Sequence, residues 1–402
     1  MNQPSFSASL PVIRLLPKTK PQAIRHGFPW VYANELVLDR RAKSLAAGSL
    51  AVLEDAERRP MAIVAVNVAS RITARVLERD LDAVIDQAWF AAKIRRALAM
   101  RETLYDAPFY RLIHAESDGL PGVVIDRFGD TAVVQPNAAY AEVMIDALAA
   151  ALAEVTGVKN ILKNASGRSR SLEGLDEESS VLLGAAPDAP VPVQMNGATY
   201  LADLTGGQKT GIFFDQRPNH EFAARLSKGA RVLDVFSHVG GFSLAALAAG
   251  AASALAVDGS DPALALAQDG ARAMGAADRF DTRKGDAFTT LEALAAKGDQ
   301  FDVVICDPPA FAPNKQALEA GLRAYERIAR LAAPLVAEGG YLGLCSCSHA
   351  ADLTKFRNAS ARGIGRGGRR GTLIYTGFAG PDHPLLPQLA ESGYLKALFF
   401  RL

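Results

Sequence analysis

A short polar run near the C-terminus carries side chains that can do covalent chemistry: Leu344-Cys-Ser-Cys-Ser-His349. The residues before it are apolar and typical of a buried strand, and strand periodicity would point Cys345 and Cys347 the same way. Cys347 lies nearer to the strand's end and is better placed to reach a ligand there. Because a cysteine thiolate forms covalent intermediates readily, Cys347 is our candidate nucleophile.

Two other interpretations of the cysteines stay open. Cys306 follows the apolar run Val303-Val-Ile305, and it and Cys345 fit the pattern of small buried hydrophobic residues. Cys345, Cys347 and His349 would supply three metal ligands, but no clear fourth ligand lies nearby. We therefore expect no metal.

Five predicted strands alternate with helical stretches in the second half of the chain, at residues 231–235, 254–257, 280–283, 302–306 and 340–345. Two more strands are predicted near residues 372–376 and 394–401. This alternation indicates an α/β fold with a doubly wound, Rossmann-like parallel sheet, in which ligands bind beyond the carboxyl ends of the strands. The helix after the second strand is expected to begin with Asp261 as N-cap and Pro262 as its first residue.

Glycines or carboxylates follow four of these strands in order. Gly240 and Gly241 would let the backbone approach a ligand, and Asp258 is placed to accept hydrogen bonds from a ribose. Asp286 could accept from an adenine amino group. The spacing G-x-G-x-x-G, which seats a pyrophosphate, is missing. An adenosine cofactor without phosphates, S-adenosylmethionine, therefore fits better than a dinucleotide.

The fourth strand ends in Asp307-Pro-Pro-Ala-Phe311, where the prolines fix the backbone. Asp307 would face the space between the cofactor and its target. The ordinary alternatives are that each strand-end aspartate caps a helix and that the proline pair makes a turn.

Composition and charge narrow the class of protein. The 402 residues are 49% hydrophobic and 22% charged, which excludes a disordered chain. The net charge of +1 hides an asymmetry, because residues 1–103 carry 16 basic and 10 acidic side chains. Three cysteines cannot build a disulfide framework, and neither a signal peptide nor a membrane span is recognisable. We expect a cytoplasmic protein in which binding and chemistry are divided between two modules. The N-terminal module is basic and the rest of the chain is mildly acidic.

Three domains are expected: residues 1–82, 83–205 and 206–402. Short β-rich runs at 50–53, 61–66 and 72–76 predict a small β-barrel, and a connecting helix is predicted from Leu81 to about Leu104. A hairpin with the loop Arg127-Phe-Gly-Asp130 and a helix over about 140–155 predict a central α+β unit. The segment 355–370 holds six basic residues and several glycines. We expect a mobile loop there, either a phosphate clamp at the mouth of the active site or merely solvated.

Nearly the whole chain resembles the bacterial 23S ribosomal RNA large-subunit cytosine-5 methyltransferase I family (RlmI). The resemblance is carried by these motifs: Arg25-His-Gly-Phe-Pro-Trp-Val31, Arg111-Leu-Ile-His-Ala-Glu-Ser-Asp-Gly-Leu-Pro-Gly122, Ile125-Asp-Arg-Phe-Gly129, Lys209-Thr-Gly-Ile-Phe-Phe-Asp-Gln-Arg217, the Phe-Ser-x-x-Gly-Gly-Phe element at 236–242, Asp307-Pro-Pro-x-Phe311, Ser346-Cys-Ser348, Asp382-His-Pro384 and Tyr394-Leu-Lys396.

The resemblance implies a PUA-like RNA-binding domain, a small central domain and a class I methyltransferase domain. It makes Cys347 the attacking thiolate, with Asp307 at the target base. The residues it assigns to the cofactor are Asp234, Phe236, Ser237, Gly240, Gly241, Asp258, Asp286, Asp307, Pro308, Gln216 and Arg217. Arg217 would pair with the methionine carboxylate, unless it forms an ordinary surface ion pair. The implied partner is 23S ribosomal RNA, and a homodimer is left open.

Carbon 5 of a cytosine is a poor nucleophile, so the implied reaction begins with thiolate addition at carbon 6. The chain departs from the family pattern at His238, where a tyrosine is more usual, and through the extra thiol of Cys345. Ala310 stands where other cytosine-5 methyltransferases have a second cysteine. Two alternatives remain: methylation of a purine amino group, which needs no cysteine, and a non-catalytic RNA-binding or ribosome assembly factor.

Overall fold

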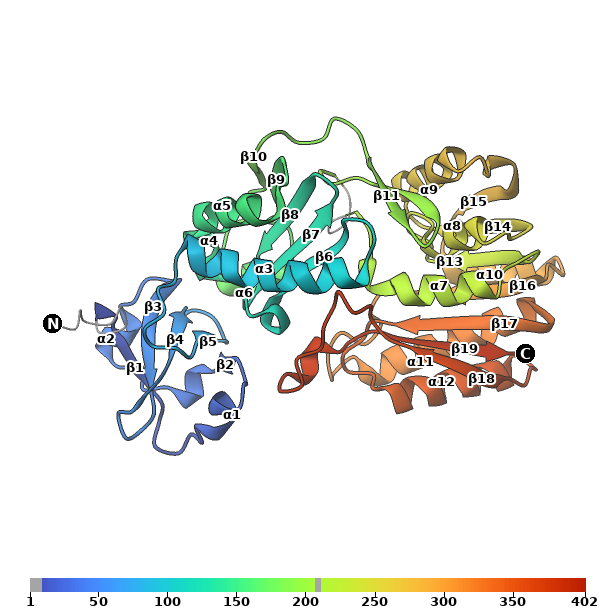
Figure 1. The fold of residues 1–402 in the computed structure, drawn as a ribbon. Coiled ribbons are helices and arrows are strands. Elements are labelled where there is room, and N and C mark those ends of the chain that lie inside the picture. The colour runs from blue at the N-terminus through green and yellow to red at the C-terminus, as the bar shows by residue number, and fades with distance from the viewer. Residues whose placement is uncertain (1–8, 207–210) are drawn as a thin grey trace. The chain divides into compact units, whose positions relative to one another are not determined.

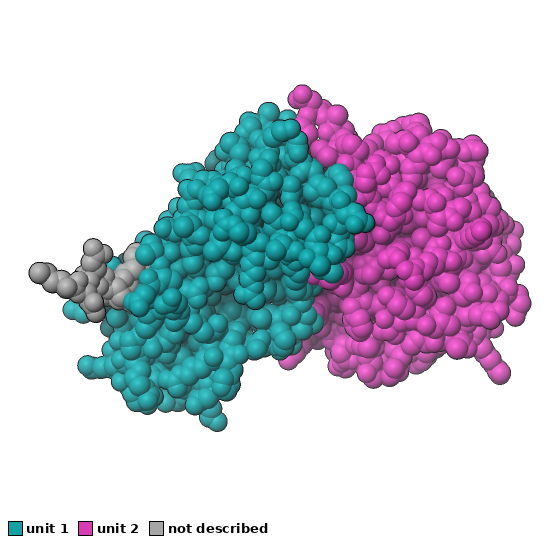
Figure 2. Space-filling view, in the orientation of Figure 1, with its two compact units in different colours: residues 1–186, 382–392 teal, residues 187–381, 393–402 magenta. Residues whose placement is uncertain are grey.

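The computed structural model describes residues 9–206 and 211–402 and divides the chain into two compact units (Figures 1 and 2). One comprises residues 1–186 and 382–392, and the other comprises residues 187–381 and 393–402. The segment 382–392 joins the first unit through hydrogen bonds: Arg101 donates to the backbone oxygen of Asp382, and the backbone N–H of Arg111 donates to the Asp382 carboxylate. The two units meet in sequence near residue 186, and the expected domain boundary at 205 remains a prediction. The expected boundary at residue 82 remains a prediction.

A five-stranded sheet near the N-terminus is built around an aliphatic core that includes Ile13, Leu53 and Val64. β1 pairs parallel to β3 and the other neighbours pair antiparallel, in the order β1-β3-β4-β5-β2. The predicted β-rich runs correspond to β3, β4 and β5. The elements are β1 (Val12–Arg14), α1 (Gln22–Arg25), β2 (Trp30–Val31), α2 (Arg40–Lys43), β3 (Ser49–Glu54), β4 (Pro60–Val66) and β5 (Ala74–Glu78).

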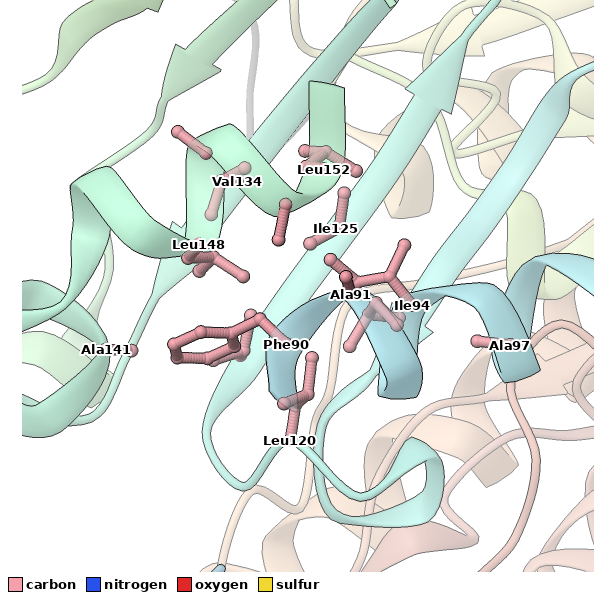
Figure 3. Close-up of a cluster of buried hydrophobic side chains, with 14 of the residues drawn as sticks. Phe90, Ala91, Ile94, Ala97, Leu120, Ile125, Val134, Ala141, Leu148 and Leu152 are labelled. Carbon is pink, nitrogen blue, oxygen red and sulfur yellow. The ribbon is translucent and has the colours of Figure 1, made fainter. Parts of the chain in front are cut away.

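The second sheet of this unit runs in the order β10-β9-β8-β7-β6, and α3 and α5 pack their apolar side chains against it. Figure 3 shows Phe90 and Ile94 of α3, Leu148 and Leu152 of α5 and Ile125 of β7 in one cluster of buried hydrophobic side chains. The elements are α3 (Gln87–Leu104), β6 (Phe109–His114), β7 (Val123–Phe128), β8 (Thr131–Pro136), α4 (Ala139–Val143), α5 (Ile145–Thr156), β9 (Asn160–Lys163), α6 (Arg168–Glu173) and β10 (Ser180–Leu183).

Three boundaries in this region differ from the predictions. The helix expected from Leu81 begins at Gln87, because the Asp86 side chain caps it by accepting from the Trp89 N–H. The loop expected over 127–130 is shorter, since β7 continues to Phe128 and β8 begins at Thr131. The helix expected over 140–155 is divided at Met144 into α4 and α5.

The second unit contains the predicted doubly wound sheet, with seven strands in the order β15-β14-β13-β16-β17-β19-β18. The first five strands in this order, from β15 to β17, pair in parallel. β19 pairs antiparallel to both β17 and β18. A separate hairpin, β11–β12, precedes it in sequence. The strands are β11 (Val191–Met195), β12 (Ala198–Ala202), β13 (Arg231–Val235), β14 (Ser253–Asp258), β15 (Phe280–Lys284), β16 (Phe301–Cys306), β17 (Val336–Ser346), β18 (Thr372–Gly377) and β19 (Lys396–Arg401).

Helices α10, α11 and α12 pack against the sheet and form a hydrophobic core with it. Leu291, Ile328 and Phe356 are their buried side chains in this core. The helices are α7 (Arg217–Arg225), α8 (Gly241–Ala248), α9 (Asp261–Ala273), α10 (Ala287–Ala296), α11 (Leu318–Ala332) and α12 (Leu353–Arg366). The N-cap of α9 is Ser260, one residue before the predicted Asp261, because the Ser260 hydroxyl accepts from the Ala263 N–H. Among the described residues, no helix is long and apolar enough to cross a membrane.

The basic segment expected to be a mobile loop is mostly helix α12, so that expectation is wrong. Asp352 caps the helix, and Phe356, Ala359 and Ile364 are buried on one of its faces. A Cβ at Gly363 would clash with the backbone oxygen of Glu326 in α11. The glycine therefore permits close packing of two helices, a tertiary contact that composition alone does not reveal.

Gly363 and Gly365 of α12 form a matched pair that tests this packing. Gly363→Ala is expected to lower the free energy of unfolding by about 1–3 kcal/mol, because the added methyl group meets the α11 backbone. Gly365→Ala meets nothing within 4 Å and is expected to be stabilising by up to about 1 kcal/mol through helix propensity. Urea unfolding of both variants measures the difference, and equal effects would contradict the packing argument.

Candidate active site

The turn that follows β13 is the most unusual backbone of the second unit. Phe236, His238 and Gly240 all have positive φ angles, of 64°, 51° and 81°. Left-handed backbone is costly for residues with a Cβ and is held only where surrounding contacts determine it. Here the Ser237 N–H donates to the Val257 oxygen at 3.1 Å, and the His238 N–H donates to the Asp258 carboxylate at 2.9 Å. The turn is thus fixed to the end of β14.

Asp234, near the end of β13, is completely buried below this turn. One carboxylate oxygen, Oδ2, accepts from the Ser243 N–H at 2.9 Å, at the start of α8. None of the described residues donates a hydrogen bond to the other oxygen, Oδ1. Burial raises the pKa of Asp234 to about 6. A buried acceptor without a donor is costly, so this position suits a ligand that supplies a donor or a positive charge.

Ser237 Oγ and Gln216 Nε2 are among the other buried polar atoms for which no hydrogen-bond partner is found in the described part of the chain. Together with Asp234 Oδ1 they offer the acceptor and donors that an amine and a carboxylate on one ligand require. The methionine end of S-adenosylmethionine carries both groups, so these residues fit the predicted cofactor. Arg217 begins α7, and its guanidinium lies 5.7 Å from the centre of the Phe214 ring. Its expected pairing with the methionine carboxylate remains a prediction.

Asp258 and Asp286 each have a structural task. Asp258 accepts from the N–H groups of His238 and Ser260, both at 2.9 Å. Asp286 is exposed and caps α10, accepting from the N–H and the hydroxyl of Thr289. The capping alternative is therefore confirmed for Asp286. A carboxylate has further lone pairs beyond those that these hydrogen bonds use. The expected contacts of Asp258 with the ribose and of Asp286 with the adenine remain predictions.

The two glycines of the turn differ in what they make possible. Gly240 adopts the left-handed conformation that begins α8. A Cβ at Gly241 would lie 2.7 Å from the His220 ring, so this glycine makes room for a side chain of α7. His220 is buried, and burial lowers its pKa to about 3, which keeps the ring neutral. Sequence analysis missed His220, because a lone histidine in a helix carries no distinguishing pattern.

Parallel pairing brings the ends of β16 and β17 together. Cys306 pairs with Leu344, so Asp307 and Cys345 follow side by side. The Asp307 N–H donates to the Val235 oxygen at 3.1 Å, which fixes this corner to the end of β13. Pro308 behind it is buried. The predicted cofactor carboxylate and target-facing carboxylate thus lie at one edge of one sheet.

The three cysteines differ in burial. Cys306 and Cys345 are 0% and 1% exposed, and burial raises the pKa of both thiols far above the ordinary value. Cys347 is only partly buried. β17 ends at Ser346, so the strand alternation expected to align Cys345 with Cys347 stops before Cys347. Only the Cys347 thiol among the three lies outside the closed core.

A buried hydroxyl cluster holds the segment around Cys347. The Tyr325 hydroxyl of α11 lies 2.7 Å from Ser348 Oγ and accepts from Ser346 Oγ at 2.9 Å. Ser348 Oγ also accepts from the Ala312 N–H, at 2.9 Å. Both neighbours of Cys347 are thereby fixed, and the thiol is carried on a rigid segment. Tyr325 was missed by sequence analysis because it is distant in the chain.

Three arginines of the basic segment 355–370 form contacts away from Cys347. Arg362 and Arg366 form ion pairs with Glu326 of α11. Arg369 donates to the backbone oxygen of Val336, the first residue of β17, whereas Cys347 follows the last residue of that strand. These three arginines lie away from the strand end that Cys347 follows, so they do not form the expected phosphate clamp.

No group of three or more His, Cys, Asp or Glu side chains within residues 9–206 and 211–402 is arranged to hold a metal ion. Lys209 and Thr210, part of one family motif, lie outside the described residues.

The raised pKa of Asp234 predicts a particular pH dependence of stability. Its folded pKa of about 6 exceeds its unfolded value of 3.8, so its contribution to stability is present below pH 4 and is lost as pH rises through 6. Relative to Asp234→Asn, the wild type should gain up to about 3 kcal/mol as pH falls from 7 to 4. Unfolding in urea across this range measures the difference.

Asp286 is the control of opposite sign, because capping lowers its pKa. Relative to Asp286→Asn, the wild type should lose stability as pH falls. A difference for Asp234→Asn that does not change with pH would contradict the assignment of a strained, buried carboxylate.

Comparisons with known proteins agree on the fold and the cofactor. A family model for S-adenosylmethionine-dependent methyltransferases matches residues 145–401, and one for a PUA-like domain matches residues 13–79. A protein solved with S-adenosylhomocysteine shares the fold, with a TM-score of 0.82 at 19% identity, covering 98% of this chain and 100% of that chain. A second structure, from Streptococcus mutans, has a TM-score of 0.80 at 18% identity with the same coverage. S-adenosylmethionine is the cofactor of the methyltransferase domain.

Curated relatives span the whole chain. The ribosomal RNA large subunit methyltransferase I of Aeromonas hydrophila is 33% identical over 392 residues, covering 96% of this chain and 98% of that protein. The protein of the same name from Aliivibrio fischeri is 35% identical over 395 residues, with the same coverage. A ribosomal RNA large subunit methyltransferase of Deinococcus radiodurans is 34% identical over 415 residues and is covered completely. The chain therefore belongs to the S-adenosylmethionine-dependent methyltransferases, in the ribosomal RNA large subunit methyltransferase I family.

Proposed function

We propose that the protein methylates carbon 5 of a cytosine in 23S ribosomal RNA, with Cys347 as the covalent nucleophile. The observation that carries the proposal is the contrast among the three thiols. Cys306 and Cys345 are enclosed, whereas Cys347 is partly exposed on a rigid segment just beyond β17. The neighbouring strand β16 leads directly into Asp307. A thiol and a carboxylate at adjacent strand ends are the two groups that activation of a pyrimidine ring needs.

The reaction follows from the weak nucleophilicity of carbon 5. The Cys347 thiolate adds to carbon 6, forming a carbon–sulfur bond and moving electron density to carbon 5 and ring nitrogen 3. S-adenosylmethionine supplies the methyl group from its sulfonium. Removal of the carbon 5 proton by a base then restores the ring and expels Cys347 as thiolate. Asp307 is assigned to ring nitrogen 3, where its carboxyl, after taking up a proton from solvent, would donate as negative charge develops.

Cofactor binding is assigned to the residues of the β13 turn and its surroundings. Asp234 Oδ1 would accept from the methionine amine, with Gln216, Arg217 and Ser237 near the methionine end. Phe236, Gly240, Gly241 and Pro308 would shape the walls of the site, and Asp258 and Asp286 would receive the ribose and the adenine. The partnerless buried atoms of Asp234, Gln216 and Ser237 support this arrangement.

Ribosomal RNA as substrate is supported by the names of the relatives and by the PUA-like domain at residues 13–79. The excess of basic side chains over residues 1–103 suits contacts to backbone phosphates. Since a stacked base hides carbon 6, the target cytosine must be unstacked or flipped out of its helix.

The product identifies the reaction. Ribosomal RNA is incubated with the protein and methyl-labelled cofactor and digested to nucleosides, and the labelled nucleoside is identified by mass spectrometry. Wild type is expected to label 5-methylcytidine. Cys347→Ala should lower the rate by at least about a thousandfold, because the nucleophile is lost. Cys345→Ala, the control for removal of a nearby thiol, should retain most of the activity.

Label in a methylated purine would contradict the cytosine assignment, and label in 5-methylcytidine that survives Cys347→Ala would contradict the nucleophile. No labelled nucleoside with any ribosomal substrate would favour a non-catalytic RNA-binding or assembly role.

A further inference from the structure

Lys396, the first residue of β19, is buried next to the segment that carries Cys347. Only 7% of its surface is exposed. Its Nζ donates to the backbone oxygens of Ser348 at 2.7 Å and Ala351 at 2.8 Å. Ser348 directly follows Cys347, so the ammonium group holds the backbone immediately beyond the thiol. β19 pairs with β17 up to Lys396 opposite Ser346, which fixes the height of the lysine along the strand.

The charge of this lysine has no carboxylate to balance it. None of the ion pairs formed by the described residues includes Lys396. Asp352, whose negative charge acts on Lys396, caps α12 and pairs with Lys355 instead. An ammonium has three N–H donors, and the two carbonyls use two of them. A buried cation in this position favours an anion close by, because its charge is poorly screened there.

Burial lowers the pKa of Lys396 to about 8, and the negative charge of Cys347 acts in the opposite direction. At neutral pH the amine is therefore still mostly protonated. The interaction is mutual: a cation that is stabilised by the Cys347 thiolate stabilises that thiolate by the same amount.

We propose that Lys396 is a positioning residue that fixes the Cys347 segment and holds Cys347 as a thiolate before RNA binds, its thiol proton having passed to solvent. This inference rests on the proposed function, in which Cys347 is the nucleophile. Packing alone does not explain a lysine at this buried position, because an apolar side chain would occupy the same space at a lower desolvation cost. The proposed role does explain it.

The other ionisable groups around Cys347 are a phenol, a carboxylate and an imidazole. Tyr325 of α11 is a neutral phenol whose pKa is raised by burial. Asp307 at the end of β16 carries negative charge and acts on the neighbouring Cys345. His349 follows the segment, with its exposed ring 5.7 Å from that of Tyr394. Among these groups, Lys396 provides the cation directly bonded to the segment.

The thiol's own titration tests the inference without RNA or cofactor. The full chain is reacted with iodoacetamide between pH 5 and 10, and alkylation of each cysteine is followed by peptide mass spectrometry. In the wild type, Cys347 should react with a midpoint below the ordinary thiol value of about 8.5, while Cys306 and Cys345 react slowly. Lys396→Met should raise the Cys347 midpoint by at least about one pH unit, slowing alkylation at pH 7 about tenfold.

Tyr325→Phe is the matched control, because it removes hydrogen bonds from the same segment without changing its charge. Its Cys347 midpoint should stay near that of the wild type. Equal shifts in Lys396→Met and Tyr325→Phe would show a structural effect alone and overturn the inference. A wild-type midpoint at or above about 8.5 would overturn it with no variant needed, even if Lys396→Met fails to fold.

The two proposals fail separately. An ordinary thiol midpoint with 5-methylcytidine as product would remove the role of Lys396 and leave the proposed function intact. A low Cys347 midpoint without 5-methylcytidine as product would leave the role of Lys396 intact and contradict the proposed function.

Discussion

The parallel pairing of β13 with β16 and of β16 with β17 is the constraint on which the site depends. Parallel strands end at the same edge of a sheet, so Asp234, Asp307 and Cys347 are brought together although more than 100 residues separate the first from the last. The pairing also determines which side chains are enclosed. Cys306 and Cys345 lie within the strands and are buried, whereas Cys347 follows the last strand residue and is not. One topological rule thus separates two enclosed thiols from a partly exposed one.

Burial then determines the electrostatics at this edge. It raises the pKa of the Asp234 carboxyl and of the two enclosed thiols, because each charged form would be poorly solvated. The anionic form of a buried carboxyl or thiol is stabilised when a positive charge lies close to it. At Asp234 the sulfonium and amine of the cofactor would supply it, and at Cys347 the Lys396 ammonium would. The same low-dielectric environment that disfavours unpaired anions makes each cation more effective.

Much of this edge could be predicted from the sequence, because strand ends carry local signals. Aspartates that follow apolar runs indicated Asp258 and Asp307, the family resemblance added Asp234, and the alternation of strands and helices predicted the sheet. The partners of these residues could not be predicted in the same way. His220 fits against Gly241 and Tyr325 holds Ser346 and Ser348 only once distant segments have packed.

The basic segment at 355–370 shows why composition alone is a weak guide. Its glycines predict a mobile loop when they are considered one by one, yet Gly363 is needed where α12 meets α11. Its arginines suggest phosphate binding, yet Arg362 and Arg366 pair with Glu326. Lys396 is the reverse case: a lysine directly before the apolar run 397–400 is visible in the sequence, but its meaning depends on the backbone oxygens of a segment more than 40 residues away.

The central claim, a covalent bond between Cys347 and carbon 6 of a cytosine, is tested most directly by trapping it. Ribosomal RNA transcribed with 5-fluorocytidine has no proton at carbon 5 to be removed, so methyl transfer should leave the adduct unable to collapse. The account predicts a protein–RNA complex that survives denaturing electrophoresis, forms only with S-adenosylmethionine, and maps to Cys347 by mass spectrometry. No complex, or one attached at Cys345, would contradict it.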